Sequence, residues 1–178
     1  KRLMFIKRDR EPVSMTFEQA TSQRHKKRQQ TETKVRKRAW SLSVLGFIPF
    51  LILSVALVFL DNQNPFMATA VDLLKTYAAV ILSFLGGIRW GIAVQNSTVG
   101  SRSRDLVWSV VPAMVGWVSL LLSTPFVFAL QILVFAAQGA WDSFAGQDKI
   151  VELWFAKLRI VLTFGVCTAL LVAFLATM

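Results

Sequence analysis

The stretch WSLSVLGFIPFLILSVALVFL, residues 40–60, has no charged side chain over 21 positions. A helix rises about 1.5 Å per residue, so roughly 20 apolar residues cross the hydrocarbon core of a bilayer. This stretch therefore predicts a transmembrane helix, and neighbouring helices can tolerate its internal Pro49. The whole chain of 178 residues is 54% hydrophobic and only 17% charged, which leaves too few charges for the surface of a soluble domain.

Further apolar stretches follow this first one. We expect an all-α, polytopic transmembrane helix bundle of about five spans, in which a membrane domain at residues 40–178 follows a basic N-terminal arm at residues 1–39. The spans are expected at about residues 40–60, 73–94, 106–123, 125–141 and 159–178.

Positive charge is concentrated before the first span. The arm carries 13 of the 20 Lys and Arg residues, and by itself it looks disordered because it is polar and charged. If the N-terminus is inside, the inner segments hold 18 basic residues and the outer segments hold Lys75 alone. The positive-inside rule therefore places the arm on the inner side and the C-terminus outside.

Arg-rich, acid-poor leaders are typical of mitochondrial proteins. Because the chain begins at Lys1 rather than Met, we expect an upstream segment that has been cleaved or left out. We expect the mitochondrial inner membrane, with the N-terminus in the matrix and the C-terminus in the intermembrane space. A bacterial inner membrane is the alternative.

The arm contains a cluster of basic residues close to the first span. Such a cluster favours binding to anionic lipid headgroups or to an acidic protein surface. Nucleic acid is the less favoured alternative, because Phe5 and Phe17 are the only aromatic residues of the arm to stack on bases. The residues expected to bind are Arg24, Lys26, Lys27, Arg28, Lys34, Arg36, Lys37 and Arg38.

Three charged residues fall at a similar depth of the predicted bundle. Arg89 lies near the inner end of the second span, Asp142 at the end of the fourth and Arg159 at the start of the fifth. An unpaired Arg inside a membrane costs about 2.5–3.5 kcal/mol on insertion scales, so we expect Asp142 to pair with one or both guanidinium groups. A structural charge clamp is the favoured interpretation. The alternatives are an anion or proton site, and extension of the Arg side chains to lipid phosphate.

Small residues recur in the second span. Ser83, Gly87 and Gly91 are four apart on one helix face, and Gly86 lies next to them. Small side chains allow the backbones of two membrane helices to approach closely. We expect this group to pack against another helix of the same bundle.

Few residues can carry catalysis or bind a metal. Cys167 is the only cysteine and His25 the only histidine, so the chain cannot form an internal disulfide and has little material for a zinc site. We find no catalytic constellation and expect neither an enzyme nor a metal. We also expect no cofactor other than a bound phospholipid such as cardiolipin.

Several motifs resemble the transmembrane protein 69 family over about residues 40–178. They are LGFIPF (45–50), YAAVILSFLGGIRWGIAV (77–94), WSVVPAMVGWVSLLLS (108–123) and WFAKLRIVLT (154–163), and Asp142 and the run from Leu158 to Thr163 match as well. The motif at 77–94 is the most specific, and the arm lies outside the resemblance. The family contains bacterial inner-membrane proteins and mitochondrial relatives of unknown function. The resemblance therefore implies a location in the mitochondrial or bacterial inner membrane, but it indicates no reaction, ligand or catalytic residue.

Two functional hypotheses from different classes remain open. The first is a non-catalytic accessory subunit or assembly element of an inner-membrane complex, most simply one of the mitochondrial respiratory chain. Its expected partners are membrane lipid and other integral membrane subunits, and not nucleic acid. The alternative is a small solute or ion transporter or channel that uses an intramembrane pair of Arg89 and Asp142.

Overall fold

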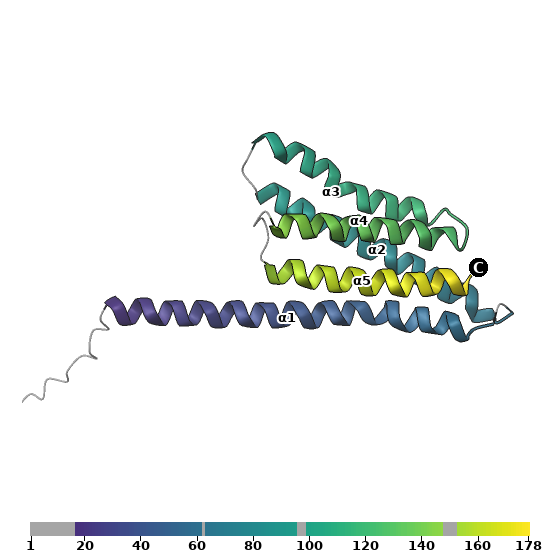
Figure 1. Ribbon diagram of the computed structural model, residues 1–178, viewed down its shortest axis with the longest axis horizontal. Coiled ribbons are helices and arrows are strands. Elements are labelled where there is room, and N and C mark those ends of the chain that lie inside the picture. The colour runs from purple at the N-terminus through teal and green to yellow at the C-terminus, as the bar shows by residue number, and fades with distance from the viewer. Residues whose placement is uncertain (1–16, 62, 96–98, 148–152) are drawn as a thin grey trace, which may run out of the picture. The chain divides into compact units, whose positions relative to one another are not determined.

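The computed structural model of the protein describes residues 17–61, 63–95, 99–147 and 153–178, and in these residues it contains five helices and no strand. The predicted all-α helical bundle is therefore confirmed. The helices are α1 (Phe17–Phe59), α2 (Pro65–Gln95), α3 (Val99–Ser119), α4 (Phe126–Gln147) and α5 (Leu153–Ala176) (Figure 1).

Four of the five helices, α1, α2, α4 and α5, are long and apolar enough to cross a membrane. The helix expected as the third span, α3, is not among them. Its first turns contain Arg102, Arg104 and Asp105, and these charges lower its hydropathy. Charged side chains at the centre of a helix oppose insertion into hydrocarbon far more than apolar ones favour it, whereas Lys and Arg near a helix end can reach the headgroup region.

The first helix begins at Phe17, well before the predicted start of the first span at Trp40. The expectation that the arm looks disordered is therefore wrong for residues 17–39. These residues contain no Gly or Pro and are rich in Gln, Lys, Arg and Glu, which are good helix formers. An exposed ion pair one turn apart, 3.0 Å from Arg28 Nε to Glu32 Oε1, adds a few tenths of a kcal/mol.

Contacts between residues divide the chain into two units, Lys1–Ala39 and Trp40–Met178. Within the second unit, the most extensive contacts are between α2 and α3 and between α4 and α5. The helix α4 also contacts α2 and α3, so it lies between α3 and α5 (Figure 1). The core between the helices is apolar, and its largest fully buried side chains include Phe50, Phe128, Leu57, Leu74, Leu82 and Leu170.

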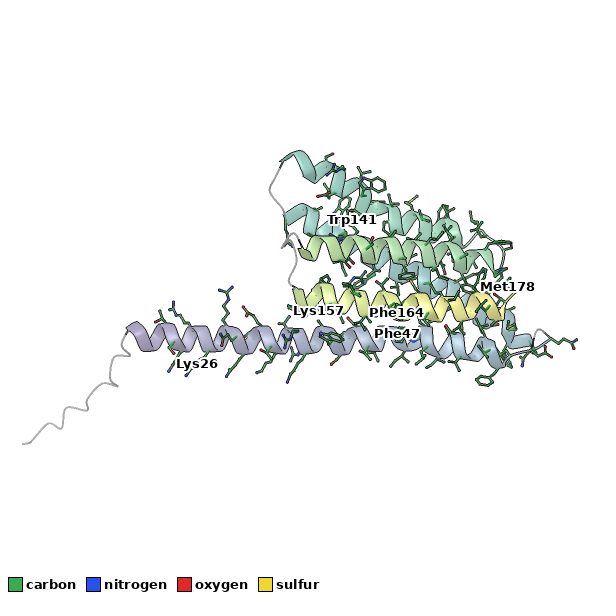
Figure 2. The ribbon with its side chains drawn as sticks, in the orientation of Figure 1. Lys26, Phe47, Trp141, Lys157, Phe164 and Met178 are labelled. Carbon is green, nitrogen blue, oxygen red and sulfur yellow. The ribbon has the colours of Figure 1, made fainter. Side chains whose placement is uncertain are left out.

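Aromatic side chains join the membrane part of α1 to the other helices. The Phe50 ring lies 5.1 Å from the Tyr77 ring of α2 and makes an edge-on contact with Phe135 of α4 at 5.9 Å. Phe47 points from α1 toward α5, where its ring lies against Gly165 (Figure 2). The Tyr77 hydroxyl also donates a hydrogen bond of 2.8 Å to the Gly46 carbonyl, close to Pro49 within the helix. These contacts supply buried area and one specific polar link.

Two pairs of helices approach closely at positions where one helix has a glycine, which carries no side chain. A Cβ atom added to Gly86 of α2 would lie 2.5 Å from the Ser109 carbonyl oxygen of α3. A Cβ added to Gly139 of α4 would lie 2.6 Å from the Thr163 side chain of α5. Atoms cannot pack at these distances, so glycine is required at both positions for the observed spacing of the helix pairs.

We expect Gly86→Ala to lower the free energy of unfolding by about 1–3 kcal/mol, because the added methyl group forces α2 and α3 apart. The matched control is Gly87→Ala, since a Cβ at Gly87 meets nothing within 4 Å. That variant should be neutral or more stable by up to about 1 kcal/mol, because alanine favours helix more than glycine does. Denaturant titration of the purified protein in detergent micelles measures both, and equal stability of the two variants would contradict the close approach.

Candidate functional site

The buried charged residues in the described part of the chain come from three helices that meet at one level of the bundle. Arg89 lies about two turns before the end of α2, and Asp142 lies just over one turn before the end of α4. Arg159 lies about two turns after the start of α5. Because α5 begins at the end of the bundle where α2 and α4 finish, all three side chains reach the same layer.

The structure brings the three residues of the predicted charge clamp together. Arg89 Nε donates a hydrogen bond of 2.6 Å to Asp142 Oδ1, and Arg159 Nε donates one of 2.6 Å to Asp142 Oδ2. Each carboxylate oxygen therefore serves one guanidinium group. All three residues are buried, with exposed fractions of 7%, 5% and 7% for Arg89, Asp142 and Arg159. We call this group the charge cluster.

The charge cluster carries a net charge of +1, because two guanidinium groups share one carboxylate. An ionised group in a low-dielectric interior is stable only when it is paired and hydrogen-bonded. The indole ring of Trp141 provides further stabilisation, since the Arg89 Cζ atom lies 4.9 Å from its centroid. A cation over an aromatic face at this distance is attracted to the electron-rich ring.

One buried donor of α4 has no acceptor among the described residues, namely Nε2 of Gln138, a residue that is only 3% exposed. Arg89 Nη2, by contrast, forms an ion pair with Asp142 Oδ1 at 2.6 Å. Gln138 precedes Asp142 by four residues, so the two share one face of α4.

A second polar contact lies toward the other end of α4. Gln131 is fully buried, and its Nε2 donates to the Lys75 carbonyl of α2 at 2.9 Å and to Ser119 Oγ of α3 at 3.1 Å. The Ser119 hydroxyl in turn donates to the Gly116 carbonyl at 2.7 Å. This contact joins three helices through one side chain, although Gln131 Oε1 has no partner in the described residues.

Sequence reasoning missed both buried glutamines. The sequence does contain a periodic pattern that indicates their position. Steps of four, three and four residues separate Gln131, Phe135, Gln138 and Asp142. These steps place all four on the face of α4 that is buried, as the exposed fractions confirm. Polar residues that recur on one face of an apolar helix indicate an interior position in a membrane protein.

The small residues of α2 divide between two faces. Gly86 packs against α3, as described above, but Cβ atoms at Gly87 and Gly91 would meet nothing within 4 Å. Ser83 is exposed and donates a hydrogen bond to the Ala79 carbonyl of its own helix. The expected packing within the bundle is therefore made at Gly86 and not at the other three positions. Successive residues are about 100° apart around a helix, so the neighbour of a contact residue faces elsewhere.

The eight basic residues expected to bind lipid or protein all lie on α1 and are exposed. Figure 2 shows Lys26 among the long side chains that stand out from this part of the helix. Their spacing distributes the charges around the helix, and the segment from Arg24 to Arg38 contains only one large apolar side chain, Val35. The segment 24–38 of α1 therefore has no apolar face with which to lie in a membrane interface. We expect this segment to bind an anionic surface through its positive charge.

The geometry of the charge cluster is that of a contact between helices. Both oxygens of Asp142 accept hydrogen bonds from the guanidinium groups of Arg89 and Arg159. Among residues 17–61, 63–95, 99–147 and 153–178, no three His, Cys, Asp or Glu side chains gather as a metal site would require.

We expect Asp142→Asn to lower the free energy of unfolding by about 3–5 kcal/mol, because it leaves two buried guanidinium groups without a carboxylate. Asp72→Asn is the matched control. It removes a carboxylate whose side chain is 66% exposed and whose ion pair with Lys75 should be worth at most about 1 kcal/mol. Folded yield and thermal unfolding in detergent measure both variants. Unchanged stability of Asp142→Asn would contradict a structural clamp.

Comparison with known proteins gives the family. The model of the family described as "Protein of unknown function (DUF3429)" matches residues 35–175. Transmembrane protein 69 of Xenopus tropicalis is 32% identical over 128 residues, which cover 71% of this chain and 49% of that protein. Transmembrane protein 69 of Mus musculus is 29% identical over 128 residues, or 71% of this chain and 51% of that protein.

This chain thus spans about half the length of these curated relatives. No solved structure matches it significantly. Together with its long apolar helices, the two matches identify a membrane protein. The resemblance seen in the sequence motifs is confirmed, and the chain belongs to the DUF3429 family, in which it is similar to transmembrane protein 69.

Proposed function

We propose that this protein is a non-catalytic subunit or assembly element of a larger complex in the mitochondrial inner membrane, and specifically of the respiratory chain. The observation that carries the proposal is the small-residue face of α2, defined by Ser83, Gly87 and Gly91. Among the residues that the structure describes, no atom lies within 4 Å of a Cβ built at Gly87 or Gly91.

The small-residue face lies in the middle of the exposed side of α2. Gly87 has open space around its missing side chain, and so does Gly91 one turn further along the helix. Large exposed side chains lie within one or two helical turns of these positions on the same helix. They are Val80, Phe84, Trp90 and Val94.

Exposed apolar side chains alone do not indicate a partner in a membrane, because lipid tails are as apolar as leucine. An exposed helix face with glycine on two successive turns is a more specific signal. It lets the backbone of a second helix approach closely, and the association gains van der Waals contact that flexible lipid tails provide less well. The charge cluster supports this role by holding α2, α4 and α5 in a fixed arrangement.

The proposed location follows from the distribution of charge. Eight exposed Lys and Arg residues precede the first apolar segment of α1, and the last of them, Arg38, lies two residues before Trp40. Basic residues next to a membrane span favour the negatively charged inner side. We place the N-terminus in the matrix and the C-terminus in the intermembrane space, with anionic phospholipid such as cardiolipin near the arm.

A transporter that uses the Arg89–Asp142 pair, the alternative raised by the sequence, has weaker support. A transport site must change its contacts as the substrate binds and leaves. Here each Asp142 oxygen holds a guanidinium group at 2.6 Å, and both groups come from buried residues of helices that pack tightly. This arrangement favours a fixed structural contact.

We expect the double variant Gly87→Leu and Gly91→Leu to release the protein from its native complex, because two leucine side chains keep the backbone of a second helix away from this face. The loss in association should be about 2 kcal/mol or more, the usual scale for a critical interface position. The monomer itself should remain folded, since both positions have open space. Native electrophoresis of solubilised mitochondrial membranes, followed by identification of co-migrating proteins, makes the measurement.

Ala137→Leu is the matched control, since it adds similar bulk to an exposed position of another span. It should leave the complex intact. A wild-type protein that migrates alone, or a double variant that migrates in the same complex as the wild type, would overturn the proposal.

For the arm, we expect a peptide of residues 1–39 to sediment with vesicles that contain phosphatidylglycerol and not with neutral phosphatidylcholine vesicles. Each Lys or Arg near an anionic surface contributes about 1 kcal/mol. Binding should be lost at about 1 M salt, where the Debye length falls to about 3 Å. Equal binding to neutral vesicles, or tighter binding to RNA, would contradict a lipid-binding arm.

A further inference from the structure

We propose that the outer face of α3 binds one anionic phospholipid, with an acyl chain in an apolar groove beside Trp90 and the phosphate group at Arg104. The groove has a volume of about 660 Å³. Trp90 of α2 forms one of its sides, and residues of α3 from Ser103 to Val115 form the rest. This volume falls within the range of about 300–1,000 Å³ that is usual for ligand sites.

The surface of the groove is apolar along most of its length. Four exposed apolar side chains of α3 form this part, namely Val107, Val110, Val111 and Met114. The polar residue Ser103 lies at the end nearest the start of α3. Hydrocarbon fits the apolar part, and a polar headgroup fits the end at Ser103.

The groove has the length of one leaflet of a bilayer. Ser103 and Val115 are 12 residues apart, which is about 18 Å along a helix axis. An acyl chain crosses half of a hydrocarbon core of about 30 Å, or about 15 Å. Trp90 lies near the end of α2 and Ser103 near the start of α3, so the polar end of the groove falls at the headgroup level, where tryptophan is favoured.

The charge beside the polar end is positive. Arg104 follows Ser103 and is exposed. At about 100° per residue, it lies within about 20° of Val111 and Val115 around the helix axis, on the side of the groove. Asp105, in contrast, lies about 180° from Met114, on the opposite side of α3. A guanidinium group at this place can donate two hydrogen bonds to a phosphate group, which favours an anionic lipid.

The shape of the groove favours an acyl chain over a partner helix. Two membrane helices pack closely through small residues, which the small-residue face of α2 offers and the groove does not. A valine side chain in a helix keeps essentially one rotamer, so Val107, Val110 and Val111 form fixed ridges. A flexible chain bends to fill the space between these ridges, whereas they hold the backbone of a second helix away.

Native mass spectrometry of the full chain tests the groove. The protein is released from a neutral detergent that contains equal amounts of phosphatidylglycerol and phosphatidylcholine, and the lipids that stay bound are counted. Val110→Trp should retain one phosphatidylglycerol fewer than the wild type, because the indole ring fills the groove. Val161→Trp is the matched control, since it adds the same bulk to an exposed valine of α5, and it should retain the wild-type number. Lipids on the basic arm are common to all three proteins and cancel in the comparison.

Arg104→Gln tests the contact with the headgroup. We expect Kd for phosphatidylglycerol to rise about fivefold, the factor that corresponds to about 1 kcal/mol for one basic residue at an anionic lipid. Kd for phosphatidylcholine should not change. Lys157→Gln is the control, because it removes another exposed basic residue, near the start of α5, and it should leave both values unchanged.

A fluorescence measurement gives a result even if Val110→Trp fails to fold. At the same low mole fraction, phosphatidylglycerol with brominated acyl chains should quench Trp90 more than brominated phosphatidylcholine does. The contribution of Trp90 is the difference between the wild type and Trp90→Phe.

Equal numbers of lipids on the wild type and Val110→Trp, or equal quenching of Trp90 by the two lipids, would overturn the proposal. An unchanged Kd for phosphatidylglycerol in Arg104→Gln would also contradict it. Loss of a co-purifying polypeptide from Val110→Trp, instead of a lipid, would place a partner helix in the groove and overturn the proposal as well.

Discussion

A single carboxylate holds the bundle together at one end. Asp142 accepts hydrogen bonds from Arg89 of α2 and Arg159 of α5, so one side chain of α4 fixes the positions of three helices. In lipid, apolar contact alone gives little preference for one arrangement of helices over another, because hydrocarbon competes with every such contact. A buried ion pair has no equal substitute in hydrocarbon, and it therefore selects one rotation and one depth for each helix that takes part.

The helix α4 acts as the centre of the membrane domain because it carries polar contacts at two levels. Gln131 binds the backbone of α2 and the hydroxyl group of Ser119 on α3, and Asp142 lies 11 residues further along. That distance is about 16 Å along a helix axis, or roughly half of the hydrocarbon core. Two specific contacts at this spacing prevent α4 from sliding or rotating against α2, and the apolar side chains between them, such as Phe135, need only fill space.

The features that depend on composition and charge balance could be predicted from the sequence. The five helices could be predicted from apolar segments, and the meeting of Arg89, Asp142 and Arg159 from the cost of leaving any of them alone in lipid. The helical arm from Phe17 was missed because a charged segment without an apolar face resembles disorder, although its residues favour helix. The choice between Gly86 and Gly87 as the contact with α3 could not be made, because both lie in one apolar segment and the side on which α3 packs is a property of the assembled fold.

The close fit of α2 and α3 has a consequence for how the protein reaches the membrane. The third helix contains Arg102, Arg104 and Asp105 in its first turns, and the apolar part that follows, residues 106–119, is shorter than the roughly 20 residues that cross a hydrocarbon core. Its neighbour in sequence is strongly apolar and meets it at Gly86 with backbone almost touching backbone. Inserted together, the two helices make this contact within the bilayer, and α2 supplies the apolar length that α3 lacks.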